Sequence, residues 1–221
     1  MEKVDQTRSR QRVSDHGEVF TSPREVNAML DLVKNETERI DSRFLEPACG
    51  HGNFLTEILR RKLDVVEARY KRSQFEYERN GVIAISSIYG IDLLPDNIAE
   101  ARERLLGIFT ERYSRLYKNE VKAECVESVR YILEKNILVG DALDLMTVGD
   151  DPKPIVFSEW SSVNGSMIKR RDYIFENLVA NIPLDGLFSD LGDQAYIHKP
   201  INEFPAVHFL KISRAFDDFI A

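Results

Sequence analysis

Cysteine is scarce in this sequence, and its scarcity argues against a disulfide framework. The chain contains two cysteines, Cys49 and Cys125. Cys49 lies in a glycine-rich turn, where a cysteine is more often a small buried hydrophobic group than a nucleophile. Two isolated cysteines of this kind are typical of a protein in a reducing compartment, so we expect free thiols and a cytoplasmic location.

Long hydrophobic runs are absent as well. No uninterrupted apolar stretch approaches the roughly 20 residues that a membrane-spanning helix needs, and the polar N-terminus lacks the pattern of a signal peptide. We therefore expect no membrane partner. Residues 1–15 are polar and rich in Arg, Gln and Ser, which predicts a flexible tail. Residues 16–221 are predicted to form a single domain, because a chain of 221 residues is short for two α/β domains.

Basic residues are fewer than acidic residues in this chain. The chain has 30 lysines and arginines against 37 aspartates and glutamates, for a net charge of −7. This balance excludes the strongly basic footprint of many nucleic-acid-binding proteins, although short basic groups occur at residues 8–12 and 169–171. The histidines show no metal-ligand spacing, so we predict no metal site from His16, His51, His198 and His208.

A glycine-containing turn is the most informative feature that is present. A short apolar run, Phe44-Leu45, ends in Glu46, and Gly50 and Gly52 follow before a helical segment begins. Glycine lets the backbone turn sharply and approach a ligand closely, and the first turn of a helix offers free N–H donors. In an open α/β sheet such a turn lies at the carboxyl end of a strand, where ligands bind.

Two further strands are predicted to end in acidic residues. Residues 88–91 form an apolar run before Asp92, and residues 137–141 form another that ends in Asp141. Helices are predicted from a capped start at Ser22-Pro23, over residues 53–61 and over residues 97–117, while residues 64–80 either extend the second helix or form a helical hairpin at the surface. This alternation predicts an α/β fold with a doubly wound, mostly parallel sheet and helices on both faces.

The last third of the chain is predicted to be less regular. A fourth strand is expected at residues 154–157, and Asn164-Gly165 is a strong signal for a hairpin turn, so residues 166–173 are expected to return antiparallel. After Ile182 the prolines and aromatic residues favour irregular structure, with a C-terminal segment that docks on the core or on a partner.

These motifs resemble those of S-adenosylmethionine-dependent methyltransferases, most closely the N6-adenine DNA methyltransferases of restriction–modification systems. Residues 46–54 are similar to the family signature D/E-P-A-C-G-S-G-x-F, with His51 in the place of its serine. The segment before the first helix resembles the Phe/Tyr-Thr-Pro cofactor motif, with Ser22 inserted between Thr21 and Pro23. The segments that begin at Gly90 and Gly140 resemble the motifs of the second and third strands. The match covers residues 16 to about 145.

The resemblance implies a Rossmann-like class I methyltransferase fold and S-adenosylmethionine as cofactor. A ribose diol needs a carboxylate acceptor such as Asp92, and three acidic strand ends beside one glycine turn fit a cofactor site better than separate helix caps do. The residues expected to bind the cofactor are Phe20, Thr21, Glu46, Pro47, Ala48, Cys49, Gly50, Gly52, Phe54, Asp92, Leu93, Asp141, Ala142 and Leu143.

The catalytic motif of the family is missing. N6-adenine methyltransferases carry [D/N/S]-P-P-[Y/F/W] after the fourth strand, where it binds the amino group and stacks on the flipped base. Two segments could substitute for it, Ser158-Glu159-Trp160 and Asn181-Ile182-Pro183-Leu184. Each also has an ordinary interpretation, since Trp160 could belong to a hairpin core and Pro183 could end a helix. The catalytic residues therefore stay unassigned.

The expected function is that of a DNA adenine N6 methyltransferase or a methylase subunit of a restriction–modification system. Because no room is left for a target-recognition domain, we expect weak DNA binding by the chain alone and a specificity or nuclease subunit as partner. Two alternatives remain open. The chain could be an inactive methyltransferase-like subunit that holds the cofactor, or it could methylate a substrate other than DNA.

Overall fold

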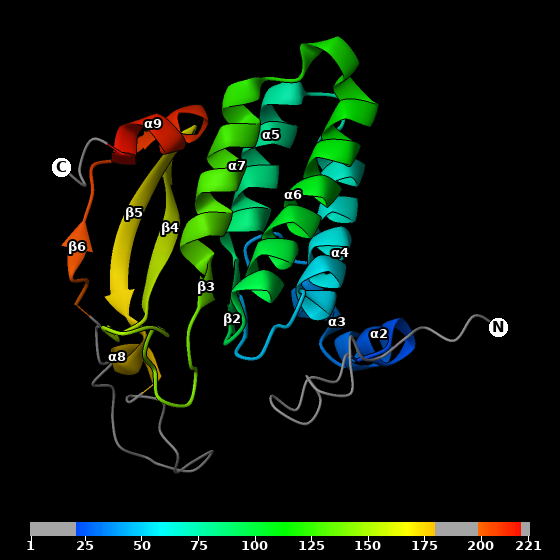
Figure 1. Ribbon diagram of the computed structural model, residues 1–221. Coiled ribbons are helices and arrows are strands. Elements are labelled where there is room, and N and C mark those ends of the chain that lie inside the picture. Colours follow the sequence, from blue (N-terminus) through cyan, green and yellow to red (C-terminus); the bar gives the residue numbers. More distant parts are fainter. Residues whose placement is uncertain (1–20, 180–198, 218–221) are drawn as a thin grey trace, which may run out of the picture.

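The computed structural model describes residues 21–179 and 199–217, which form a mixed α/β structure with two separate sheets (Figure 1). Strands β1 (Phe44–Glu46), β2 (Ile88–Asp92) and β3 (Ile137–Val139) form a parallel sheet in the order β1-β2-β3. The predicted strands at residues 44–45 and 88–91 are confirmed. The third strand was predicted over residues 137–141 and is shorter, since it ends at Val139. A mixed α/β fold with a parallel sheet is thus confirmed. The predicted tail at residues 1–15 lies outside the described residues.

Pairs of helices connect the parallel strands. Helices α4 (Asn53–Tyr70) and α5 (Gln74–Ser86) link β1 to β2, and α6 (Pro95–Tyr117) and α7 (Ala123–Asn136) link β2 to β3. Helix α4 packs on α5 and α6, and α7 packs on the same two helices, so the four form a bundle that stands beside the small sheet (Figure 1). The short element η1 (Lys118–Glu120) joins α6 to α7.

The helical pair α4–α5 settles an alternative that the sequence left open. Residues 64–80 contain the end of α4 and the start of α5, so they form part of a helical hairpin. Most residues of this segment are exposed or half-buried, as expected for a surface hairpin, but Tyr77 and Glu78 of α5 are fully buried. The reason is that Glu78 accepts hydrogen bonds from Tyr113 and from Lys122 Nζ, which satisfy its charge inside the bundle.

The second sheet is antiparallel and packs on the first, since Tyr89 and Ile91 of β2 share a buried apolar cluster with Phe157. Strands β4 (Val156–Asn164) and β5 (Met167–Ile174) pair as a hairpin, and the short strands β6 (Asn202–Glu203) and β7 (Val207–His208) pair with β5. The hairpin turn is confirmed at Asn164-Gly165, where Gly165 has a φ of +52°. The fourth strand begins at Val156 and runs seven residues beyond the predicted end at Phe157, because its backbone pairs with β5 as far as Asn164.

The remaining helices are short. Helices α2 (Pro23–Asp31) and α3 (Lys34–Thr37) precede β1, and α8 (Phe175–Val179) follows β5. The predicted start of α2 is confirmed, since Ser22 and Glu25 form a capping box with each other. At the other end of the chain, η2 (Phe209–Lys211) and α9 (Ile212–Asp217) pack on α7, and Phe209, Ile212 and Phe216 are fully buried. The described C-terminal segment therefore docks on the core, as one of the two interpretations of the sequence proposed.

A buried ion pair ties the C-terminal segment to the second sheet. The guanidinium of Arg170 donates to both carboxylate oxygens of Asp172 at 2.8 Å, and it also donates to the hydroxyl of Tyr131 at 2.9 Å. Its flat face lies 4.5 Å from the ring centre of Phe204 and 5.6 Å from that of Phe216. Arg170 and Asp172 are 6% and 4% exposed, so this pair is part of the core where β5, α7 and α9 meet.

A buried lysine fixes the loop that leads into β1. Lys62 of α4 is fully buried, and its Nζ donates to the carbonyl oxygens of Arg39 (3.0 Å), Ile40 (3.0 Å) and Ser42 (2.5 Å) and to Ser87 Oγ (2.9 Å). Burial lowers the pKa of this amine to about 7. Because these acceptors come from two segments, Lys62 holds the loop at residues 39–42 against the start of β2.

Candidate functional site

The acidic strand ends lie together at one edge of the parallel sheet. Glu46 ends β1, Asp92 ends β2, and Asp141 follows β3 by two residues. The parallel register continues past the strand ends, because Cys49 N donates to Ile91 O at 2.9 Å and Gly140 N donates to Asp92 O at 3.0 Å. The carboxyl ends of parallel strands meet at the same edge, so the structure brings these predicted residues together as the sequence indicated.

The glycine turn joins this edge to α4 through left-handed backbone conformations. Gly50 has a φ of +52° and Gly52 a φ of +85°, values that favour glycine strongly. A Cβ atom on Gly52 would lie 3.2 Å from Ala101 Cβ, so the turn also lets the start of α4 pack closely on α6. Both glycines of the motif are therefore required by the backbone, which explains their positions just before a helix.

Asp92 holds the glycine turn to the end of β2. Its Oδ2 accepts a hydrogen bond from Gly50 N at 2.9 Å, and its Oδ1 accepts from Leu94 N at 3.0 Å and from Asn97 Nδ2 at 3.1 Å. An ionised carboxylate has about four acceptor positions, so these bonds leave room for about one more donor. Asp92 is half-buried, so part of it is accessible to solvent.

The other two carboxylates differ in their surroundings. Burial raises the pKa of the Glu46 carboxyl, and the backbone N–H of Ala48 acts in the opposite direction. Asp141 Oδ1 accepts from Leu143 N at 2.8 Å and from Asp144 N at 3.3 Å, an Asx-type turn after β3. Among residues 21–179 and 199–217, no lysine or arginine forms an ion pair with any of these carboxylates. The edge is therefore acidic and suits a cationic ligand group.

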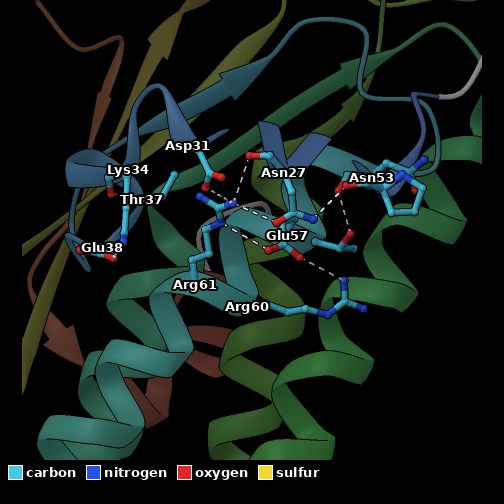
Figure 2. Close-up of polar contacts among 11 residues, drawn as sticks. Asn27, Asp31, Lys34, Thr37, Glu38, Asn53, Glu57, Arg60 and Arg61 are labelled. Atoms are coloured by element: carbon cyan, nitrogen blue, oxygen red, sulfur yellow. Dashed lines mark hydrogen bonds and ion pairs between the residues drawn. The ribbon is translucent and has the colours of Figure 1, made fainter. Parts of the chain in front are cut away.

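Polar contacts hold helix α2 against α4 (Figure 2). Arg61 of α4 donates to Asn27 Oδ1 at 2.9 Å and forms ion pairs with Asp31 at 2.8 Å and with Glu57 at 3.3 Å. At the start of α4, Asn53 Nδ2 donates to Thr21 O at 3.1 Å. These contacts bring Thr21, the first described residue of the predicted cofactor motif, next to the turn.

Arg104 is a site residue that the sequence did not reveal. It lies on α6, and its Nη1 donates to His51 O at 2.6 Å and to Asn53 Oδ1 at 3.1 Å, while the same nitrogen contacts His51 Nδ1. Burial lowers the pKa of this guanidinium. In the sequence Arg104 follows Glu100 by four residues, a spacing typical of a charge pair on one helix. Only the packing of α4 on α6 shows that Arg104 supports the turn.

The remaining predicted residues differ in their exposure. Cys49 is buried and burial raises the pKa of its thiol, which fits a packing role. The side chains of Leu93 and Leu143 are 45% and 94% exposed at the same edge as the carboxylates. Pro47 and Ala48 are exposed, whereas Phe54 and Ala142 are half-buried against the core. Phe20 lies outside the described residues.

One candidate for the missing catalytic motif does not have the expected geometry. Ser158-Glu159-Trp160 was predicted to follow the fourth strand, but these residues lie inside β4. Trp160 is 7% exposed and its indole N–H donates to Asn136 Oδ1 at 3.0 Å, while Ser158 Oγ donates to Asp172 at 2.8 Å. Both side chains are used by the core, because β4 is longer than predicted. The other candidate, residues 181–184, lies outside the described residues.

Comparisons of this chain with protein-family models, with curated proteins and with solved structures found no match. In the described part of the chain, no helix has both the length and the apolar character needed to cross a membrane. Within the same residues, no group of three His, Cys, Asp or Glu side chains is placed to hold a metal ion. The fold and the site thus define a mixed α/β protein with an acidic, glycine-containing edge at the carboxyl ends of its parallel strands.

Proposed function

We propose that this chain binds S-adenosylmethionine at the carboxyl edge of β1, β2 and β3. The observation that carries the proposal is the hydrogen bond from Gly50 N to Asp92 Oδ2, which joins the glycine turn to an acidic strand end. With Glu46 and Asp141 at the same edge, the site combines close backbone approach with carboxylates that lack basic partners among the described residues. That combination fits a ligand with a positive charge and a diol.

The residues present fit the parts of this cofactor. The remaining acceptor position of Asp92 suits a ribose hydroxyl. The three carboxylates, which form no ion pair within the described residues, would attract the sulfonium charge. Asp141, Ala142 and Leu93 would contact the adenine. Thr21, Glu46, Ala48 and Gly50 would hold the methionine tail. When bound, the cofactor supplies an activated methyl group, and the chain's own contribution is to orient it, since methyl transfer depends mainly on positioning.

We further propose that the chain is a DNA adenine N6 methyltransferase or a methylase subunit of a restriction–modification system. The support is the motif order along the chain, from Thr21 through residues 46–54 to Asp92 and Asp141, together with the parallel sheet on which they lie. In this proposal β1, β2 and β3 are half of a doubly wound sheet of the class I methyltransferase type. A specificity or nuclease subunit supplies sequence recognition, and the free cysteines favour a cytoplasmic location.

A second candidate function is a subunit that holds the cofactor without transferring its methyl group. The observation that favours it is the engagement of Ser158 and Trp160 in the core, which removes one of the two candidate amino-group clamps. A methyltransferase with a substrate other than DNA is the third candidate, since the same cofactor edge would serve it equally.

The chain alone is expected to methylate DNA weakly or not at all. Without acceptors for the N6 hydrogens the amino lone pair stays delocalised into the adenine ring, and the net charge of −7 gives little attraction to a phosphate backbone. Transfer of tritiated methyl groups to unmethylated genomic DNA measures this, with and without candidate partner subunits. Activity only with a partner supports the methylase subunit, and none with any partner favours the cofactor-holding subunit. Efficient site-specific transfer by the lone chain would contradict the expectation.

A further inference from the structure

A polar cavity lies at the opposite end of the parallel strands from the acidic edge. It has a volume of about 580 Å³ and is bounded by the loop at residues 38–43, by α5 and by β4. The loop leads into β1 and α5 leads into β2, so the cavity faces the amino ends of these strands. It shares no residue with the candidate cofactor site, and its volume is within the range of about 300–1,000 Å³ that is usual for small-molecule sites.

Arginines from three separate segments line this cavity. Arg39 and Arg43 come from the loop, Arg69 from the end of α4 and Arg79 from α5, while the carboxylates in the lining are Glu38 and Asp41. The lining thus holds four positive and two negative side chains. Three of the arginines also have carboxylate partners outside the lining, since Arg39 pairs with Glu36, Arg43 with Glu159 and Arg79 with Glu76. Arg69 forms no ion pair within the described residues, so it is the positive charge that can attract an anion into this concave site.

Two of these guanidinium groups have unused donors. Arg69 makes no hydrogen bond or ion pair with any residue of the described ranges 21–179 and 199–217. The Nε of Arg79 is buried and has no hydrogen-bond partner in the described part of the chain, and it lies 3.8 Å from Glu76 Oε2. Arg79 Nη1 donates to Gly165 O at 3.3 Å, which fixes the side chain against the tip of the β4–β5 hairpin.

The loop at residues 38–43, which carries Arg39 and Arg43, is held in place by the buried side chain of Lys62. Lys62 binds three of its carbonyl oxygens, so Arg39 and Arg43 stand on a backbone that is fixed before any ligand arrives. The ion pairs of Arg39 with Glu36 and Asp41 are long, at 3.6 Å and 3.9 Å, and exposed, so they hold this guanidinium weakly. Arg43 pairs with Glu159 of β4.

We propose that this cavity binds a phosphate group of a nucleotide, either free or within a nucleic-acid strand. Guanidinium groups that converge from several directions match the several oxygens of a phosphate, and arginine donates to phosphate in a bidentate manner. The lining also includes Ile83 and the largely buried side chains of Trp160 and Ile168, so one wall of the cavity is apolar. The proposal does not depend on cofactor binding at the other edge.

Trp160 provides a local signal for the test, because it is the only tryptophan of the chain and lines the cavity. The full chain is titrated with inorganic phosphate, with adenosine monophosphate and with a single-stranded DNA oligonucleotide, and the fluorescence of Trp160 is followed. We expect a saturable change with at least one of these probes. Saturation by the mononucleotide identifies a free nucleotide as the ligand, and saturation by the oligonucleotide alone identifies a strand.

Charge-removing variants show whether the signal comes from this cavity. Arg69→Gln and Arg79→Gln are each expected to weaken binding about tenfold, because each removes a charge-assisted contact. Arg72→Gln removes the same charge from an exposed position three residues from Arg69 that does not line the cavity, and it should bind like the parent. Circular dichroism checks that each variant is folded. No saturable change with any probe, or equal binding by folded Arg69→Gln and the parent, would overturn the proposal.

Discussion

Replacing Asp92 with alanine is expected to weaken binding of S-adenosylmethionine by at least tenfold. The carboxylate is proposed to accept a ribose hydroxyl, and a charge-assisted hydrogen bond of this kind contributes about 1.5–3 kcal/mol, or about ten- to a hundredfold in affinity. The same change frees Gly50 N from its bond to Asp92, so the glycine turn also loses its link to β2. Isothermal titration calorimetry of the parent and the variant measures the difference.

Two further variants separate the effect of charge from that of the turn. Asp92→Asn keeps an acceptor oxygen for Gly50 or Leu94 and loses the charge, so its affinity should fall between those of the parent and Asp92→Ala. Glu127→Ala removes a carboxylate from the exposed face of α7 and should bind like the parent. If Asp92→Ala is folded and binds as tightly as the parent, then Asp92 does not contact the cofactor.

The largest expected effect on stability belongs to the buried ion pair. Replacing Arg170 with methionine leaves the carboxylate of Asp172 inside the core with Ser158 Oγ as its remaining described side-chain donor. Removing one partner of a buried pair costs about 3–5 kcal/mol in the free energy of unfolding. The loss of the guanidinium also removes the surface on which Phe204 and Phe216 pack, so α9 should loosen first. Urea unfolding followed by circular dichroism measures the change.

A double variant tests whether the cost comes from the unpaired charge. Arg170→Met with Asp172→Leu replaces both members by apolar side chains, and such a replacement is often close to neutral. The double variant should therefore recover much of the stability that the single variant loses. A folding free energy of Arg170→Met within about 1 kcal/mol of the parent would show that the pair is not a structural element of the core.

The parts of the fold that the sequence predicted are those with a strong local signal. The second and third strands are apolar runs followed by the acidic residues Asp92 and Asp141. Helix α6 has apolar residues at helical spacing from Ile98 to Phe109. The capping box of α2 and the Asn164-Gly165 turn also depend only on residues that are neighbours in the sequence. Each of these could be read from a few neighbouring residues, and the structure has them in the predicted places.

The parts that were missed depend on packing between distant segments. Helix α7 was not predicted, and neither was the burial of Tyr77 and Glu78 of α5 inside the bundle. The length of β4 follows from its pairing with β5, which no local pattern fixes. In the site, the carboxylates could be predicted from strand ends, whereas Arg104 could not, because its role arises from α6 lying against the turn at His51.

Calorimetric titration of the full chain with S-adenosylmethionine tests the central claim most directly. The acidic edge formed by Glu46, Asp92 and Asp141 beside the glycine turn predicts saturable binding in the micromolar range, a free energy on the order of −8 kcal/mol. The demethylated product, which lacks the sulfonium charge, should bind the same site. Absence of both measurable heat and a thermal shift at millimolar cofactor would contradict the proposal that this edge is a cofactor site.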